Sequence, residues 1–235
     1  MLLQLLCYRV GPFVVVFVAV VVGLLMTSDA NRKRDSLPWH QTPQWQQLLR
    51  TYDDTLATRM DSSLRGCKSR YISTDFGETH VVDCGVSHPT PPAQKPLALF
   101  FHGAGSNSLM YSDWILPRLR TTHHCVALDF VCDTGKSSPP EGDPERCPQD
   151  EASLAEWVRQ VVRGLDATTT TSTSTPMLHL VGYSYGSFVA TAVAKHVPVE
   201  RMVWMAPASV VAPVQLSWIW RAIFYGLTRT EAMHN

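Results

Sequence analysis

The segment Met177–Phe188, MLHLVGYSYGSF, carries the strongest structural signal in the chain. Its first five residues are an apolar run, which is typical of a strand buried on both faces of a sheet. The run passes into Gly182-Tyr183-Ser184-Tyr185-Gly186, and residues 188–196 are predicted to form a helix. A G-x-S-x-G pattern between a strand and a helix predicts a nucleophile elbow, in which glycines are needed because the turn around Ser184 is tight. The alternative is a serine that only caps the helix.

A second glycine-rich stretch follows another apolar run. Residues 97–101, LALFF, are followed by His102-Gly103-Ala104-Gly105. Acyl transfer needs two backbone N–H groups that converge on the oxyanion. Ala104 and Tyr185 would supply them, and the two glycines of this loop would let its backbone approach closely. The alternative is an ordinary glycine turn.

The remaining predicted elements alternate between strands and helices. They are a helix at 44–60, strands at 71–74 and 79–84, a helix at 108–120, a strand at 125–130, a helix at 151–165 and a strand at 202–205. A loop is expected at 85–96, and the low-complexity residues 168–176 are expected to connect a helix to a strand. This order predicts an α/β fold, with a mostly parallel sheet, helices on both faces and an antiparallel hairpin in front.

Together these residues resemble the α/β-hydrolase fold superfamily, of the AB hydrolase-1 type. The resemblance runs from about Tyr71 to Leu227 and rests on LALFFHGAG, VALDF and GYSYG. The hairpin STDFGETHVV and the loop DTGKSSP after Asp129 are similar to small bacterial carboxylesterase-like hydrolases. The resemblance implies acyl-enzyme chemistry on a small-molecule ester or related acyl compound, without a cofactor. It implies these roles: Ser184 as nucleophile, Ala104 and Tyr185 as oxyanion hole, and His102, Gly103, Gly182 and Gly186 as supports of the two motifs.

The other triad residues do not follow the serine in a recognisable place. The superfamily order is serine, then acid, then histidine. After Ser184 the only acids and histidines are His196, Glu200, Glu231 and His234. His196 falls near the far end of the helix that begins at the elbow, where we expect it to cap that helix. We therefore expect a carboxyl-truncated hydrolase without the acid and the histidine, or alternatively a non-catalytic, membrane-tethered binding protein of the same fold.

The amino-terminal segment predicts a membrane association. Residues 10–26 contain no charge and are just long enough to span a bilayer, with Arg9 before them and a basic cluster at 32–34 after them. The basic cluster favours a cytoplasmic carboxyl side, although orientation stays open. A single-pass anchor is expected; a signal peptide cleaved near Ser28-Asp29-Ala30, leaving a protein of the secretory pathway, and a buried core helix are the alternatives.

The expected domain organisation has four parts. They are a membrane or signal-anchor segment (1–35), an amphipathic helical linker (36–66), an incomplete hydrolase core (67–212) and the start of a lid (213–235). The lid stretch contains PVQLSWIWRAIFYGL, whose apolar character favours a hydrophobic acyl group in the substrate.

Composition and cysteine usage limit the remaining possibilities. The 235 residues are 45% hydrophobic, with 20 Lys+Arg against 20 Asp+Glu, so a disordered chain and a basic nucleic-acid binder are both disfavoured. No metal-type Cys/His spacing occurs. Cys67 and Cys84 bracket the predicted hairpin and could pair, as could Cys132 and Cys147 across one loop; free thiols are the alternative.

Overall fold

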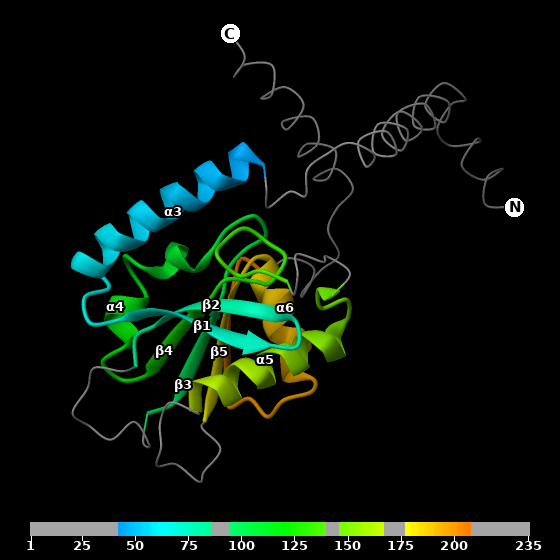
Figure 1. The fold of residues 1–235 in the computed structure, drawn as a ribbon. Helices are drawn as coiled ribbons and strands as arrows, with labels where there is room; N and C mark the ends of the chain where they lie inside the picture. The colour runs from blue at the N-terminus through cyan, green and yellow to red at the C-terminus, as the bar shows by residue number, and fades with distance from the viewer. Residues whose placement is uncertain (1–41, 86–94, 140–145, 167–176, 208–235) are drawn as a thin grey trace, which may run out of the picture. The chain divides into compact units, whose positions relative to one another are not determined.

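The structure of the protein is a computed structural model that describes residues 42–85, 95–139, 146–166 and 177–207 (Figure 1). The chain divides into two compact units, residues 1–48 and 49–235, and helix α3 (Pro43–Asp61) crosses this division. The expected membrane segment, the connection at 168–176 and the expected lid lie outside the described residues. Within the described ranges, no helix combines the length and the apolar character that crossing a membrane requires.

The described residues from Leu49 onward form a six-stranded sheet in the order β1-β2-β4-β3-β5-β6. Two strands form an antiparallel hairpin, and the other four run parallel to one another. The strands are β1 (Lys68–Thr74), β2 (Gly77–Asp83), β3 (Leu97–Phe101), β4 (His124–Leu128), β5 (Leu178–Tyr183) and β6 (Arg201–Met205). The predicted hairpin, the four predicted apolar strands and the mostly parallel sheet are confirmed.

Side chains of the central strands alternate between two hydrophobic clusters, one on each face of the sheet. In β3, Leu97, Leu99 and Phe101 pack in one cluster with α5 (Glu151–Asp166) and α6 (Tyr185–Ala194). Ala98 and Phe100 belong to the opposite cluster, together with residues of α3 and the short helices after β3. Because a strand alternates its side chains, a fully apolar run such as LALFF fits only between two covered faces. Figure 1 shows α5 and α6 lying together beside the sheet.

The predicted helix over 108–120 is wrong. The structure has a 3₁₀ helix, η3 (Ser108–Tyr111), and a separate single turn, α4 (Leu116–Leu119). Pro117 lies in the first turn of α4, where its missing N–H costs nothing, whereas inside one long helix it would break a backbone hydrogen bond. The helix expected at 188–196 begins earlier, at Tyr185.

Both cysteine pairs that the sequence permitted form disulfides. Cys67–Cys84 joins the two open ends of the β1–β2 hairpin, and Cys132–Cys147 closes the loop that follows β4. Cys125, inside β4, is buried and free. The second disulfide holds the loop beside the carboxyl ends of the strands, where the candidate site lies.

Candidate active site

Ser184 occupies the turn between β5 and α6 in a strained backbone conformation. Its φ is 51° and its ψ is −115°, values that are rare for a residue with a side chain. Its N–H donates to the carbonyl of Met205 at 2.9 Å, which continues the β5–β6 pairing past the end of the strand. Strain of this kind persists only where the surrounding structure holds it, so the turn has the local geometry that a nucleophile elbow requires.

Two glycines of the elbow are required by backbone contacts. A Cβ atom on Gly182 would lie 2.3 Å from the carbonyl oxygen of Gly186, and one on Gly186 would lie 2.0 Å from the carbonyl oxygen of Phe101. Real Cβ atoms do not approach backbone atoms this closely. A Cβ on Gly103 would lie 3.5 Å from the Ser184 Cβ, so the loop after β3 lies against the elbow.

His102 is a buried structural histidine. Its Nδ1–H donates to the carbonyl of Gly103 at 2.8 Å, and its Nε2 accepts the N–H of Phe130 at 3.0 Å. This pair of contacts fixes the neutral tautomer with the proton on Nδ1, because Nε2 must be unprotonated to accept. Burial is the main cause that lowers the pKa of His102. Both ring nitrogens are occupied, so His102 positions the loop after β3 and has no free nitrogen to take a proton from Ser184.

Two backbone N–H groups near the serine are unoccupied within the described residues. Tyr185 is the first residue of α6, where an N–H has no partner within the helix. The N–H of Ala104 likewise makes no hydrogen bond to any described residue, whereas the neighbouring Gly105 N–H donates to both carboxylate oxygens of Asp133 at 3.2 Å. The loop therefore has one N–H held by a carboxylate and one available, at the position predicted for the oxyanion hole.

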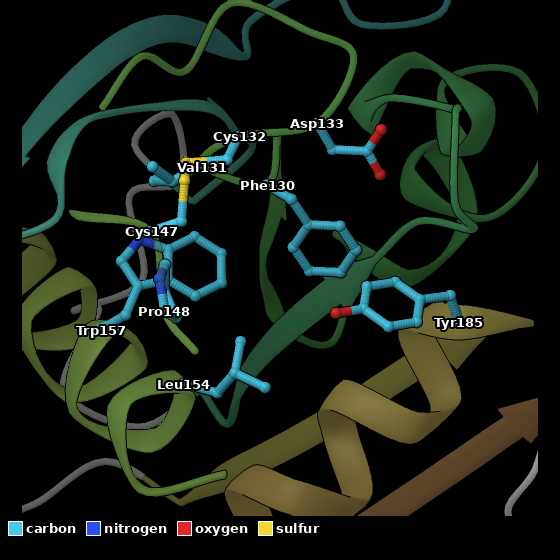
Figure 2. A pocket seen from close by; sticks show the side chains of 9 residues that line it. All are labelled: Phe130, Val131, Cys132, Asp133, Cys147, Pro148, Leu154, Trp157 and Tyr185. Atoms are coloured by element: carbon cyan, nitrogen blue, oxygen red, sulfur yellow. A yellow bond between two sulfur atoms is a disulfide. The ribbon is translucent and has the colours of Figure 1, made fainter. Parts of the chain in front are cut away.

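A cavity of about 300 Å³ opens beside Tyr185 (Figure 2). Residues of the loop after β4, of α5 and of α6 line it: Phe130, Val131, Cys132, Asp133, Cys147, Pro148, Leu154, Trp157 and Tyr185. Burial, and then the charge of Asp133, raise the pKa of the Tyr185 hydroxyl. No local pattern in the sequence predicts this cavity, because its walls come from three segments that are separate in the chain.

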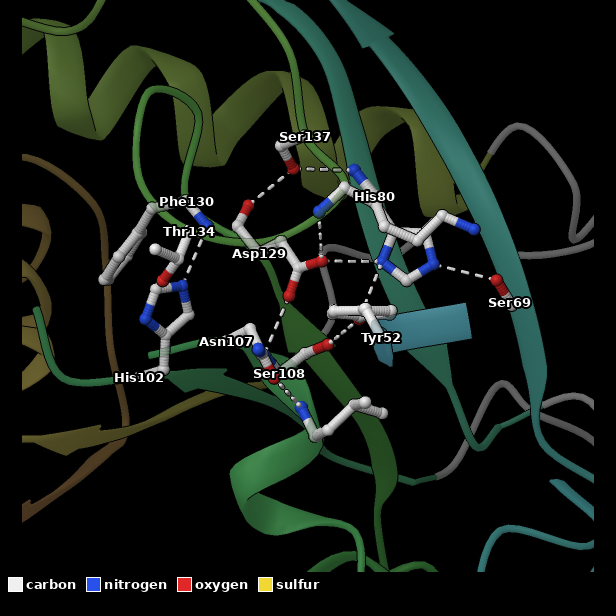
Figure 3. A network of polar contacts seen from close by, with 12 residues as sticks. Tyr52, Ser69, His80, His102, Asn107, Ser108, Asp129, Phe130, Thr134 and Ser137 are labelled. Carbon is white, nitrogen blue, oxygen red and sulfur yellow. Dashed lines mark hydrogen bonds and ion pairs between the residues drawn. The ribbon is translucent and has the colours of Figure 1, made fainter. Parts of the chain in front are cut away.

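A buried polar network centred on Asp129 is likewise not predicted by any local pattern in the sequence (Figure 3). Asp129 follows β4, and its carboxylate accepts the Nδ1–H of His80 at 2.9 Å and the backbone N–H groups of Ser108 at 2.7 Å and Lys136 at 2.9 Å. Burial on its own would raise the pKa of Asp129, but these hydrogen bonds and the attraction of His80 outweigh it, so the pKa lies below its usual value. The network ties the loop after β3 to the loop after β4. The similarity of the DTGKSSP loop to known hydrolases was the one available hint.

The described triad candidates lie away from Ser184. His196 is exposed just beyond the end of α6, and the C-cap position predicted for it is taken by Lys195. Glu200 donates its backbone N–H to Leu178 at the amino end of β5 and lies within 3.4 Å of the His179 ring. Among the described residues, no histidine or carboxylate hydrogen-bonds the Ser184 hydroxyl. Glu231 and His234 fall outside the described ranges.

Comparisons of the sequence point to carboxylesterases. The chain is 30% identical over 124 residues to the protein named "Uncharacterized carboxylesterase nap" of Bacillus subtilis, a match covering 51% of this chain and 33% of that protein. It is 27% identical over 177 residues to carboxylesterase YbfK of Bacillus subtilis, covering 74% of this chain and 52% of that one. The matches thus span between a third and about a half of these relatives' lengths.

Solved structures share the fold. Naproxen esterase from Bacillus subtilis superposes with a TM-score of 0.58 at 22% identity, over 80% of this chain and 57% of that one. Carboxylesterase CesB (YbfK) gives 0.57 at 23%, over 75% and 55%. A sequence model described as "Alpha/beta hydrolase family" matches residues 98–233. This match covers more than half of the chain and both motifs around Ser184, and the chain belongs to the alpha/beta hydrolase family.

Proposed function

We propose that the protein is a serine hydrolase that acts on a carboxylic ester or a related acyl bond. The strained conformation of Ser184 at the amino end of α6 carries this proposal. The matches to carboxylesterase nap and carboxylesterase YbfK support it and suggest an ester as the substrate. The chain aligns with only part of the length of each of these relatives.

In this proposal the Ser184 hydroxyl attacks the acyl carbonyl and the carbonyl oxygen becomes an oxyanion. The free N–H groups of Ala104 and Tyr185 would donate to it, and the positive end of α6 would stabilise its charge. A base must take the hydroxyl proton. His102 cannot be that base, because its Nδ1–H and Nε2 are both engaged.

A fluorophosphonate probe tests the nucleophile. We expect the probe to label the full chain on Ser184, as located by mass spectrometry of the digested protein, because it reports an activated serine hydroxyl. Ser184→Ala should abolish the labelling. Ser62→Ala is the matched control, since Ser62 is exposed just after α3 and its hydroxyl donates only to the Thr58 carbonyl. Labelling that persists in Ser184→Ala would refute Ser184 as the nucleophile.

The second candidate is a non-catalytic binding protein of the same fold. It is favoured by one observation: within the described residues, no acid or histidine side chain reaches the Ser184 hydroxyl. Removing the triad partners of a serine hydrolase lowers its rate by several orders of magnitude. No labelling of Ser184 at any probe concentration would support this candidate.

We also propose that residues 10–26 anchor the protein in a membrane by a single pass, with the hydrolase part on an oxidising side. The apolar run supports the anchor. The disulfides Cys67–Cys84 and Cys132–Cys147 support the side, because structural disulfides are rare in reducing compartments. They weigh against the cytoplasmic orientation that the basic cluster at 32–34 favours.

Membrane fractionation tests the anchor. We expect the full chain to stay in the membrane pellet after alkaline carbonate extraction, and a variant lacking residues 1–35 to leave it, because peripheral contacts do not survive that treatment. An amino terminus near Ala30 on the mature protein would contradict the anchor and support a cleaved signal peptide instead.

A further inference from the structure

We propose that the cavity beside Tyr185 is the acyl-binding pocket of the enzyme and that it selects an uncharged, apolar acyl group of about hexanoyl size. This inference rests on the proposed hydrolase function and adds a substrate class to it. The position of the cavity supports this inference, because its wall includes the side chain of Tyr185, the residue directly after Ser184.

Aromatic and aliphatic side chains form much of the cavity wall, beside the polar groups of Asp133 and Tyr185. Phe130 stands between two other rings: its centroid lies 5.7 Å from that of Tyr185 and 5.9 Å from that of Trp157. The polar edge of Trp157 is satisfied elsewhere, since its Nε1–H donates to Thr79 Oγ1 at 2.8 Å. Leu154 closes the α5 side. Figure 2 shows these side chains directed toward a common space.

Asp133, the charged side chain that lines the cavity, is engaged in hydrogen bonds with backbone N–H groups. Asp133 accepts the N–H groups of Gly105 and Thr134, so its carboxylate is bound by the loops around the oxyanion position. Figure 2 shows this carboxylate pointing away from the Phe130 ring. The Tyr185 hydroxyl is a further polar group of the lining side chains, and no described residue hydrogen-bonds it. An anionic acyl group would be repelled by Asp133, whereas an apolar one meets rings and aliphatic carbon.

The disulfide Cys132–Cys147 covalently fixes the wall of the cavity that these two residues line. It joins residues 15 positions apart and restricts the chain that forms this wall. Val131 and Pro148, next to the two cysteines, also line the cavity. A wall held in this way is formed before the substrate arrives, which lowers the cost of ordering on binding. The cavity, about 300 Å³, is at the small end of ligand sites, which suits one short acyl chain.

Hydrolysis of p-nitrophenyl acetate, hexanoate and dodecanoate by the full chain tests the size selection. We expect kcat/KM for hexanoate to exceed that for the other two by about tenfold; relative to acetate, this is the effect of burying about two of the four additional methylenes. Leu154→Trp narrows the cavity and should lower the hexanoate-to-acetate ratio by about tenfold. Leu154→Ala enlarges it and should move the preference toward dodecanoate. The matched control is Arg163→Trp, which adds the same ring on an exposed position of α5 and should leave the ratio unchanged.

A binding measurement separates this inference from the proposed chemistry. Ser184→Ala is mixed with ethyl hexanoate, and saturation-transfer NMR reports contact without turnover. We expect a transfer signal that disappears in Ser184→Ala/Leu154→Trp and is retained in Ser184→Ala/Arg163→Trp. Binding without any hydrolysis by the unmodified chain would uphold the pocket and refute the hydrolase. Hydrolysis with the same chain-length preference in both Leu154 variants, each with an unaltered circular dichroism spectrum, would refute the pocket.

Discussion

Asp129→Asn should lower the free energy of unfolding by about 3 kcal/mol at neutral pH, because it removes one acceptor oxygen of a buried carboxylate and leaves a buried N–H donor without a partner, which costs about 1–3 kcal/mol. Asp129 and His80 have no exposed side-chain surface, and their Oδ2 and Nδ1 atoms lie 2.9 Å apart. An asparagine can accept through one oxygen only, so its amide group would face an N–H donor. Urea unfolding followed by circular dichroism measures the change.

The groups around Asp129 and His80 explain why no neighbouring acceptor can replace the lost carboxylate oxygen. His80 Nε2 is already bonded to Ser69 Oγ at 2.8 Å, and the Tyr52 hydroxyl lies 3.3 Å from Nδ1 and 2.9 Å from Ser108 Oγ. Each group is in contact with another member of the network, as the dashed lines in Figure 3 show. Removing one acceptor leaves buried donors without a partner, and such donors cost more than the hydrogen bond contributed.

The effect of Asp129→Asn should also depend on pH. The pKa of Asp129 is lowered in the folded protein, so its contribution is present above the usual aspartate pKa and is lost as the pH falls through the folded-state value. The difference between wild type and variant should therefore narrow from about pH 7 to about pH 3, a value below the usual aspartate pKa of about 3.9.

Asp53→Asn is the matched control for Asp129→Asn. Asp53 pairs with Lys136 Nζ at 2.6 Å, but its side chain is 55% exposed. Exposed pairs contribute about 0–1 kcal/mol, so the same chemical change should have little effect there. Equal losses in the two variants would show that the buried network contributes no more than a surface ion pair.

The parts of the fold that could be predicted are those whose signal is local. An apolar run such as LALFF identifies a strand covered on both faces, and the structure has β3 at those five residues. Hydrophobic spacing likewise located α5 to within a residue. The helix over 108–120 could not be predicted correctly, because Pro117 is compatible both with a kinked helix and with the start of a new one.

The candidate site was predictable to the same extent. GYSYG and HGAG are each a short continuous stretch of sequence, so the strand-to-helix turn and the loop after β3 could be located from the sequence. The Asp129–His80 pair and the Gly105–Asp133 contact join residues that lie 49 and 28 positions apart. No local pattern specifies which distant acid a buried histidine or a loop N–H will meet. The roles of Ser184, Ala104 and Tyr185 and the membrane anchor stay predictions.

Gly186→Ala should remove the candidate site and much of the stability together. Its new Cβ would lie 2.0 Å from the carbonyl oxygen of Phe101 and 2.6 Å from that of His102, both backbone atoms of the neighbouring strand and loop. Relief requires α6 to move away from β3. We expect a loss of about 3 kcal/mol or more, at or above the usual upper end for overpacking. Thermal unfolding measures the loss, and fluorophosphonate labelling of Ser184 should fall with it.

Gly103→Ala is the matched control for Gly186→Ala. It adds the same methyl group, but the atoms nearest to that group belong to side chains and not to the backbone. Its Cβ would first meet the ring of Tyr183, at 3.1 Å, and that side chain is 39% exposed and can shift. We expect a loss of about 1 kcal/mol, the lower end of overpacking. An unfolding midpoint for Gly186→Ala equal to that of Gly103→Ala would mean that the elbow adapts to a side chain. The close approach of α6 to β3 would then not be what holds Ser184 in its strained conformation.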